Sequence, residues 1–178
     1  MTARITPGRT RDTGLAVQGF ARLAGRVTGT EPPAVFLTLG RHRRLFWGWL
    51  VFAGALMPGG RLTRRETELV ILRVATLSGS DYELTQHRRL GRKAGLSADE
   101  IDRLALGADD PSWSEGDRLL LEVTDELHAD ANLSDATWSR LRAAYDERRC
   151  IELVMLVGHY QMLATTLNTL RVSPDRSR

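Results

Sequence analysis

The sequence predicts an all-α protein, an interpretation that depends on three observations. Apolar residues recur at helical spacing, few stretches alternate between apolar and polar residues, and several apolar segments follow a Ser or Thr with a Glu three residues further on. This last pattern, the capping box, is typical of helix N-termini because the two side chains satisfy free backbone amides of the first turn. The chain has 178 residues, enough for one domain with a buried core, so we expect about seven or eight helices joined by short loops.

The first predicted helix spans residues 34–57. Pro32 and Pro33 precede it, and proline suits the first turn of a helix because its missing amide would have no partner there. The helix ends before the segment PGG at 58–60. Its apolar run LFWGWLVFAGALM, at 45–57, is too short to span a membrane and is typical of a buried helix or a subunit interface.

Three capping boxes predict the next three helices. They pair Thr63 with Glu66, Ser80 with Glu83, and Ser97 with Glu100. The helix after Thr63 is apolar almost all round, so we expect it to be buried. The helix after Ser80 should end at Gly95 as a left-handed C-cap, and the helix after Ser97 at about Gly107.

The remaining predicted helices begin after Ser114 and Ser134, and the last one runs from about residue 147 to 171. We predict that residues 15–172 form a single domain. Residues 1–14 and 173–178 are polar and contain Gly, Pro and Ser, so we expect them to be a flexible N-terminal arm and a flexible tail.

The composition indicates a soluble, cytoplasmic protein. Apolar residues make up 42% and charged residues 26% of the chain, as in ordinary globular proteins. The single cysteine, Cys150, allows no internal disulfide, and the first residues contain no apolar run of the kind a secretory signal needs. We therefore expect no membrane partner.

The charges are distributed unevenly along the chain. Residues 41–93 contain 11 basic and 4 acidic residues, whereas residues 96–147 contain 4 basic and 14 acidic ones. A basic segment can bind nucleic acid, but no nucleic-acid-binding motif accompanies these arginines. We expect no nucleic-acid partner and interpret the two segments as complementary surfaces within or between subunits.

Glu83 and His87 form the first candidate pair for chemistry. Residues four apart share one face of a helix, so the two side chains can meet and move protons together. The alternative is that Glu83 only closes the capping box, with its carboxylate bonded to the Ser80 amide. The spacing leaves both interpretations open.

Glu68 lies among apolar neighbours in the predicted buried helix. A buried glutamate must be paired or protonated, so Glu68 is a candidate for a raised pKa and for a functional site. The alternative is an ion pair with an arginine such as Arg65 or Arg73.

No pattern in the sequence predicts a metal or a cofactor. The histidines have no close metal-ligand spacing, no Cys/His cluster occurs, and no glycine-rich phosphate loop is present. His159 lies in the most apolar helix, where a single histidine is typical of either a satisfied core residue or a binding residue.

The segment LTRRETELVILRVATLSGSDYELTQHRRLGRKAGLSADEIDRLALG resembles the core motif of the carboxymuconolactone decarboxylase and alkylhydroperoxidase D (AhpD) superfamily. The resemblance extends from about Pro32 to Val172 and implies an AhpD-like helical bundle. In the peroxidase branch, a Cys-x-x-Cys pair is followed by a His, with a Glu in the preceding helix. At these positions this chain has Ser80, Glu83, His87 and Glu68. A thiol peroxidase, the peroxiredoxin-type activity of the superfamily, needs two thiols that Ser80 and Glu83 do not supply.

The decarboxylase branch also lacks the cysteines, and the resemblance implies a lyase that acts on a small carboxylated lactone. It implies Glu68, Glu83 and His87 as catalytic residues. Candidate substrate-binding residues are Arg73, Tyr82 and His159, since an arginine can hold a carboxylate with two parallel bonds.

Three functional hypotheses follow from these residues. The first is a cofactor-free acid–base enzyme for a small carboxylated or lactone-like substrate. The second is a helical oligomer that binds a small molecule or partner without catalysis. The third and weakest is a thiol peroxidase. The resemblance also implies a homo-oligomer, from dimer to hexamer, with the segment at 45–57 and the final helix as interface candidates.

Overall fold

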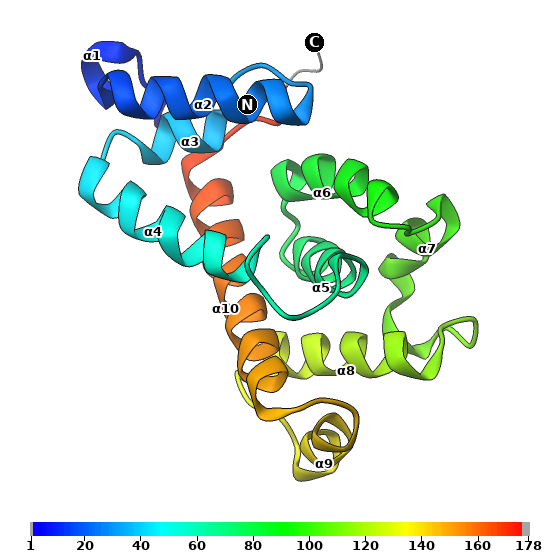
Figure 1. Cartoon of the computed structure of the whole chain (residues 1–178). Helices are drawn as coiled ribbons and strands as arrows, with labels where there is room; N and C mark the ends of the chain where they lie inside the picture. Colours follow the sequence, from blue (N-terminus) through cyan, green and yellow to red (C-terminus); the bar gives the residue numbers. More distant parts are fainter. Residues whose placement is uncertain (1, 176–178) are drawn as a thin grey trace. The chain divides into compact units, whose positions relative to one another are not determined.

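The computed structural model describes residues 2–175, which contain ten α-helices, one 3₁₀ helix and no β-strand (Figure 1). In chain order the helices are α1 (Thr10–Thr13), α2 (Leu15–Thr28), α3 (Ala34–Leu39), α4 (Arg43–Leu56), α5 (Arg64–Leu77), α6 (Asp81–Lys93), α7 (Ala98–Arg103), the 3₁₀ helix η1 (Leu104–Asp109), α8 (Glu115–Asp130), α9 (Asp135–Ala144) and α10 (Glu147–Leu170). The predicted all-α class is confirmed.

The chain divides into two compact units. We name these units by their place in the sequence: the two terminal segments, Met1–Gly54 and Thr166–Arg178, form the outer unit, and the middle segment, Ala55–Thr165, forms the central unit. The single domain predicted for residues 15–172 stays a prediction.

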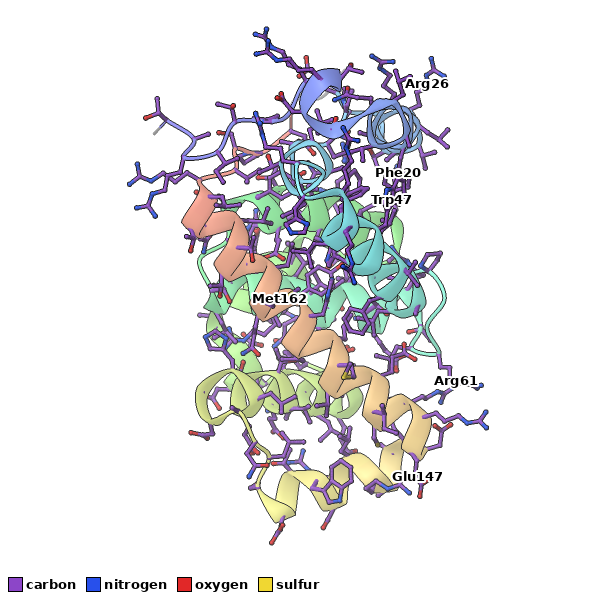
Figure 2. The ribbon with its side chains drawn as sticks, turned by 90° about the vertical axis from the view of Figure 1, so that its left-hand side faces the viewer. Phe20, Arg26, Trp47, Arg61, Glu147 and Met162 are labelled. Atoms are coloured by element: carbon purple, nitrogen blue, oxygen red, sulfur yellow. The ribbon has the colours of Figure 1, made fainter. Side chains whose placement is uncertain are left out.

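Aromatic side chains from three helices form the core of the outer unit. Phe46 of α4 is buried, and its ring centroid lies 5.0 Å from that of Trp47 and 6.2 Å from that of Phe36 in α3. Phe20 of α2 lies 6.2 Å from Trp47, and the two residues are neighbours in Figure 2. The rings meet edge to face, the arrangement that aromatic quadrupoles favour.

The helix predicted over residues 34–57 is broken in the structure into α3 and α4, so that prediction was wrong. A Cβ at Gly40 would lie 2.4 Å from Val17 Cγ1, which shows how closely α2 approaches the break. His42 then begins α4, because its ring Nδ1 accepts a hydrogen bond from the Leu45 amide. The apolar character of residues 45–57 predicts neither of these two contacts.

Parts of the predicted flexible arm and tail have defined contacts. Residues Thr10–Thr13 form α1, and the Arg4 amide donates to the Leu170 carbonyl over 3.0 Å. At the other end, Asp175 Oδ1 accepts from the Ala34 amide over 2.7 Å, in the first turn of α3. Residue 1 of the predicted arm and residues 176–178 of the predicted tail lie outside the described residues.

Helix α5 occupies the middle of the central unit, between α6 and α8 (Figure 1). Six of its apolar side chains are fully buried: Leu69, Val70, Ile71, Leu72, Val74 and Ala75. The predicted buried helix is confirmed. Polar side chains on such a helix need partners inside the protein, since an unpaired buried polar group destabilises the fold.

Four helices of the central unit begin at a serine or threonine cap. Thr63 before α5 and Ser97 before α7 form the complete capping boxes that the sequence predicts. Ser114 and Ser134 accept hydrogen bonds at the starts of α8 and α9. These caps fix where α5 and α7 begin, and the start of α5 sets the position of Glu68 one turn later.

Helix α10 is the longest element, with 24 residues. By length and composition it would reach across a membrane, and half of its most apolar window is buried inside the protein. Its central-unit part carries His159 and Tyr160.

Candidate functional site

Three helices of the central unit bring four buried side chains together. Glu68 comes from α5, Glu83 and His87 from α6, and Tyr160 from α10. We call these four residues the acid–base cluster. The structure therefore places the three predicted catalytic residues close to one another.

Glu68 and His87 form a direct pair. Glu68 Oε2 lies 2.7 Å from His87 Nδ1, and the Glu68 side chain has no exposed surface. The other oxygen, Oε1, accepts a hydrogen bond of 2.7 Å from Arg64 Nη2. Two hydrogen bonds from nitrogen atoms compensate the burial of this carboxylate, which otherwise would be strongly unfavourable.

The pair fixes the orientation of the His87 ring. With Glu68 ionised, Nδ1 carries the proton of the hydrogen bond, so Nε2 holds the lone pair of the neutral imidazole. The Tyr160 ring packs edge to face against His87, with centroids 5.2 Å apart. His87 can therefore act as a base at Nε2 while Glu68 positions it.

Glu83 has a different environment. Its side chain is almost fully buried, and neither carboxyl oxygen has a hydrogen-bond partner among residues 2–175. Burial raises the pKa of Glu83 from 4.5 to about 7, while the Ser80 hydroxyl and the His87 charge act in the opposite direction. A carboxyl group with a pKa near 7 can both donate and accept a proton under physiological conditions.

The predicted capping box between Ser80 and Glu83 is wrong. Ser80 makes no side-chain cap bond, and its amide donates instead to the Ala75 carbonyl over 2.9 Å. That bond closes the end of α5 around Gly79, whose φ is +57°, in the manner of a Schellman motif. Because the Ser80 amide is already bonded, Glu83 has no capping role. The Ser80 hydroxyl is close enough to lower the pKa of Glu83, but it does not meet hydrogen-bond geometry.

The two arginines considered as partners of Glu68 bind elsewhere. Arg65 holds Glu100 and Asp117, while Arg73 binds Asp125 through two hydrogen bonds of 2.6 and 3.0 Å. Arg64 pairs with Glu68 instead, so both proposed partners were wrong.

Arg73 also differs from its predicted substrate-binding role. Its third guanidinium nitrogen donates to the Leu104 carbonyl over 2.6 Å, so every nitrogen of the group has a partner. A Cβ at Gly107 would lie 2.7 Å from Arg73 Nη2. Arg73 therefore joins α5 to η1 and α8, and the structure does not bring it into contact with the acid–base cluster.

The other two candidate substrate-binding residues are buried. Tyr82 lies in the first turn of α6, directly before Glu83. His159 packs edge to face on Tyr160, with centroids 5.1 Å apart, so Tyr160 lies against both His159 and His87. Burial lowers the pKa of His159 to about 4, which keeps the ring neutral at pH 7.

Two residues at the cluster, Arg64 and Tyr160, are not among those that the sequence predicts as functional. Arg64 carries a signal that was available, because it lies four residues before Glu68 on the same helix. Tyr160 could not be assigned from the sequence, since it meets His87 only through the packing of α10. Burial and the charges of Glu68 and Glu83 raise the pKa of Tyr160 well above its usual range, and Arg64 acts against this rise.

No group of three or more metal-binding side chains is arranged around a common point in the part of the chain that the structure describes. The single cysteine, Cys150, is buried near the start of α10, where its thiol contacts the Tyr145 carbonyl. The positions of the two thiols in the peroxidase motif are taken by Ser80 and Glu83. Dithiol chemistry thus has no second thiol in this chain.

Comparison with known proteins supports the same superfamily. The model of the carboxymuconolactone decarboxylase family matches residues 43–126, which include Glu68, Glu83 and His87. No match was found among proteins of curated function.

Solved structures share the fold at low sequence identity. An AhpD-core, peroxidase-related protein from Ralstonia eutropha JMP134 has a TM-score of 0.85 and 18% identity, over 97% of this chain and 92% of that one. A peroxidase-related protein from Silicibacter sp. TM1040 has a TM-score of 0.80 and 17% identity, over 89% and 84%. The debrominase Bmp8, in complex with 2,3,4-tribromopyrrole, has a TM-score of 0.80 and 13% identity, over 99% and 94%.

The family match covers the helices that carry both acids and the histidine, and the structural neighbours extend the likeness over nearly the whole chain. Residues 43–126 of this chain therefore match the carboxymuconolactone decarboxylase family, and the chain shares its fold with AhpD-like proteins, with Ser80 and Glu83 in place of the two motif cysteines.

Proposed function

We propose that the protein is a cofactor-free acid–base enzyme, a lyase acting on a small carboxylated or lactone-like substrate. The observation that supports this proposal most strongly is Glu83. A structural carboxylate would be paired, as Glu68 is, whereas Glu83 is buried without a partner and has a pKa of about 7. Unpaired buried carboxyl groups destabilise a protein, and they occur where function needs them.

The cluster supplies two proton-transfer groups with different environments. His87 has its Nδ1 on Glu68, which leaves Nε2 to act as a base, and Glu83 in its neutral form can act as an acid. In a decarboxylation, the bond between a carbon atom and the substrate carboxylate breaks and releases carbon dioxide. The electron pair of the broken bond is delocalised onto the lactone carbonyl as an enolate, and Glu83 then delivers a proton to a carbon of this enolate to complete the product.

The direct test is turnover of a panel of small carboxylated lactones that includes carboxymuconolactone. In D₂O the product should carry one deuterium at a carbon of the former enolate, which NMR detects. Replacing Glu83 by glutamine keeps the shape of the side chain but removes the acid, and should lower kcat by about 10²-fold or more. Arg88→Gln is the control, because the Arg88 side chain is 54% exposed and pairs only with the exposed Asp102. Full activity in Glu83→Gln would refute the proposal.

A binding protein without turnover is the second candidate function. It is favoured by the loss of both motif cysteines at Ser80 and Glu83, which removes the chemistry of the peroxidase branch. A panel compound that binds the protein at the acid–base cluster but is never converted would support this candidate over the enzyme.

We further propose that the protein forms a homo-oligomer through α10. The exposed side chains of Ile151, Met155 and Met162 lie on one stripe of this helix by their spacing of four and seven residues, with open space beside Gly158. Figure 2 labels Met162 on α10. The stripe contains no charged side chain, so it suits an equally apolar surface such as the same helix of a second copy. Met155→Arg should shift the molar mass measured by light scattering toward the monomer. An unchanged oligomer would exclude this interface.

A further inference from the structure

Arg64 uses fewer of its hydrogen-bond donors than the other two arginines of α5. Arg65 and Arg73 bind carboxylates and a carbonyl through two or more of their nitrogens. Arg64 makes one hydrogen bond in the described part of the chain, from Nη2 to Glu68 Oε1. A guanidinium group has five N–H donors, so most of those on Arg64 are available to a ligand.

The position of Arg64 connects the acid–base cluster to solvent. Its side chain is 45% exposed, whereas the Glu68 carboxylate that it holds is fully buried. The charges of Arg64, Glu68 and Glu83 all act on Tyr160, which places the guanidinium group near the same tyrosine as both acids. Arg64 is thus the member of this neighbourhood that an incoming molecule can reach from solvent.

We propose that Arg64 binds a carboxylate group of the substrate and so restricts the site to small anionic molecules. This inference rests on the proposed acid–base function and adds a residue that determines specificity. A planar guanidinium group matches the two oxygens of a carboxylate, and its bond to Glu68 fixes its plane before a ligand arrives.

The neighbouring arginine provides a precedent for one guanidinium group holding two carboxylates. Arg65 donates from Nη1 to Asp117 and from Nη2 to Glu100. Arg64 already uses Nη2 for Glu68, so a substrate carboxylate on its remaining nitrogens would complete the same arrangement. Glu83, unpartnered and about half protonated at pH 7, would repel such an anion less than an ordinary glutamate.

Benzoate and benzamide are suitable probes, since they have nearly the same shape and differ in charge. Binding to the full-length protein is measured at constant ionic strength from the NMR signals of the Glu83 carboxyl carbon and the His87 ring nitrogens. Benzoate should bind saturably to the wild type and more tightly than benzamide. Arg64→Gln should weaken benzoate binding about tenfold or more, the loss expected for a hydrogen bond to a charged group.

Two further variants make the result specific. Arg88→Gln removes one positive charge beside His87 in sequence and should leave benzoate affinity unchanged. Arg64→Lys keeps the charge but loses the planar fork, so it should bind benzoate more weakly than the wild type. If circular dichroism shows that Arg64→Gln is unfolded, the benzoate affinity of Arg64→Lys is the measurement that tests the inference.

Unchanged benzoate affinity in the folded Arg64 variants would overturn the inference, as would equal binding of benzoate and benzamide or no saturable benzoate binding by the wild type. Failure of the acid–base function is a separate result. It would appear as full turnover in Glu83→Gln, whatever the affinity of the Arg64 variants for benzoate.

Discussion

Glu68 Oε2 and His87 Nδ1 lie 2.7 Å apart and join α5 to α6 inside the central unit. Both side chains are buried, and the second oxygen of Glu68 is held by Arg64. A histidine held by a carboxylate in this way has a fixed tautomer and a fixed ring plane, which are the properties that a catalytic base needs. The same pair also contributes to the stability of the fold.

Glu68→Ala should destabilise the protein, because it leaves the buried His87 Nδ1 without a partner. Arg64 can turn toward solvent, so most of the lost stability comes from the unpaired His87. We expect the free energy of unfolding to fall by about 2–3 kcal/mol, measured by urea denaturation. Glu147→Ala is the control, since Glu147 is 82% exposed and its nearest ion-pair distance to Arg142 is 3.6 Å. Equal midpoints for Glu68→Ala and the wild type would contradict the pairing.

Two serines that look alike in sequence should respond differently to replacement by alanine. Ser97 accepts a hydrogen bond from the Glu100 amide, so Ser97→Ala should cost about 1 kcal/mol. Ser80 has a buried hydroxyl with no hydrogen bond, so Ser80→Ala should leave stability unchanged or raise it slightly. Thermal unfolding of both variants at one pH compares them directly. A larger loss for Ser80→Ala than for Ser97→Ala would restore the capping interpretation.

The sequence predicts those helix starts that depend on hydrogen bonds between residues close in the chain. The caps at Thr63 and Ser97 depend on residues three positions apart. The same pattern does not form a capping box at Ser80, because the Ser80 amide donates its hydrogen bond to the carbonyl of Ala75, in the preceding helix. The pattern is identical in the three cases, but only the structure shows that one of the amides is already bonded.

Long-range contacts decided the rest of the site. Arg73 looked available for a substrate carboxylate, yet its partner Asp125 lies 52 residues away in sequence. At the break between α3 and α4, Val17 of another helix approaches Gly40 closely, and Tyr160 meets His87 only through the packing of α10 against α6. Periodicity and spacing within one helix carry no information about such contacts.

Replacing Arg73 should affect stability and leave the acid–base cluster intact. Arg73→Gln removes the two-bond contact with Asp125 and the bond to the Leu104 carbonyl. Both groups would lose their partner, so we expect a loss of about 2–4 kcal/mol in urea denaturation. In the folded variant, the NMR signals of His87 and Glu83 should match those of the wild type. Shifts at both residues comparable to those in Glu68→Ala would show that Arg73 belongs to the site after all.

The raised pKa of Glu83 makes the stability of the protein depend on pH in a direction opposite to that of an ordinary paired glutamate. The pKa is about 7 in the folded protein and 4.5 without its environment. Between these values the folded state binds more protons than the unfolded state, so the free energy of unfolding falls as the pH rises. The total effect of this one group is at most about 3 kcal/mol and is complete above pH 7.

Glu83→Gln removes this dependence because glutamine does not titrate. Relative to the wild type, the variant should therefore be more stable at pH 8 than it is at pH 5. The quantity to measure is the difference in unfolding free energy between variant and wild type at each pH, since the contributions of all other titrating groups then cancel. Glu147→Gln, an exposed site, should show a difference that is independent of pH. If the Glu83→Gln difference is equally flat, Glu83 is ionised and solvated in the folded protein. The acid role proposed for it would then lose its basis, because a glutamate with an ordinary pKa holds no proton to donate at pH 7.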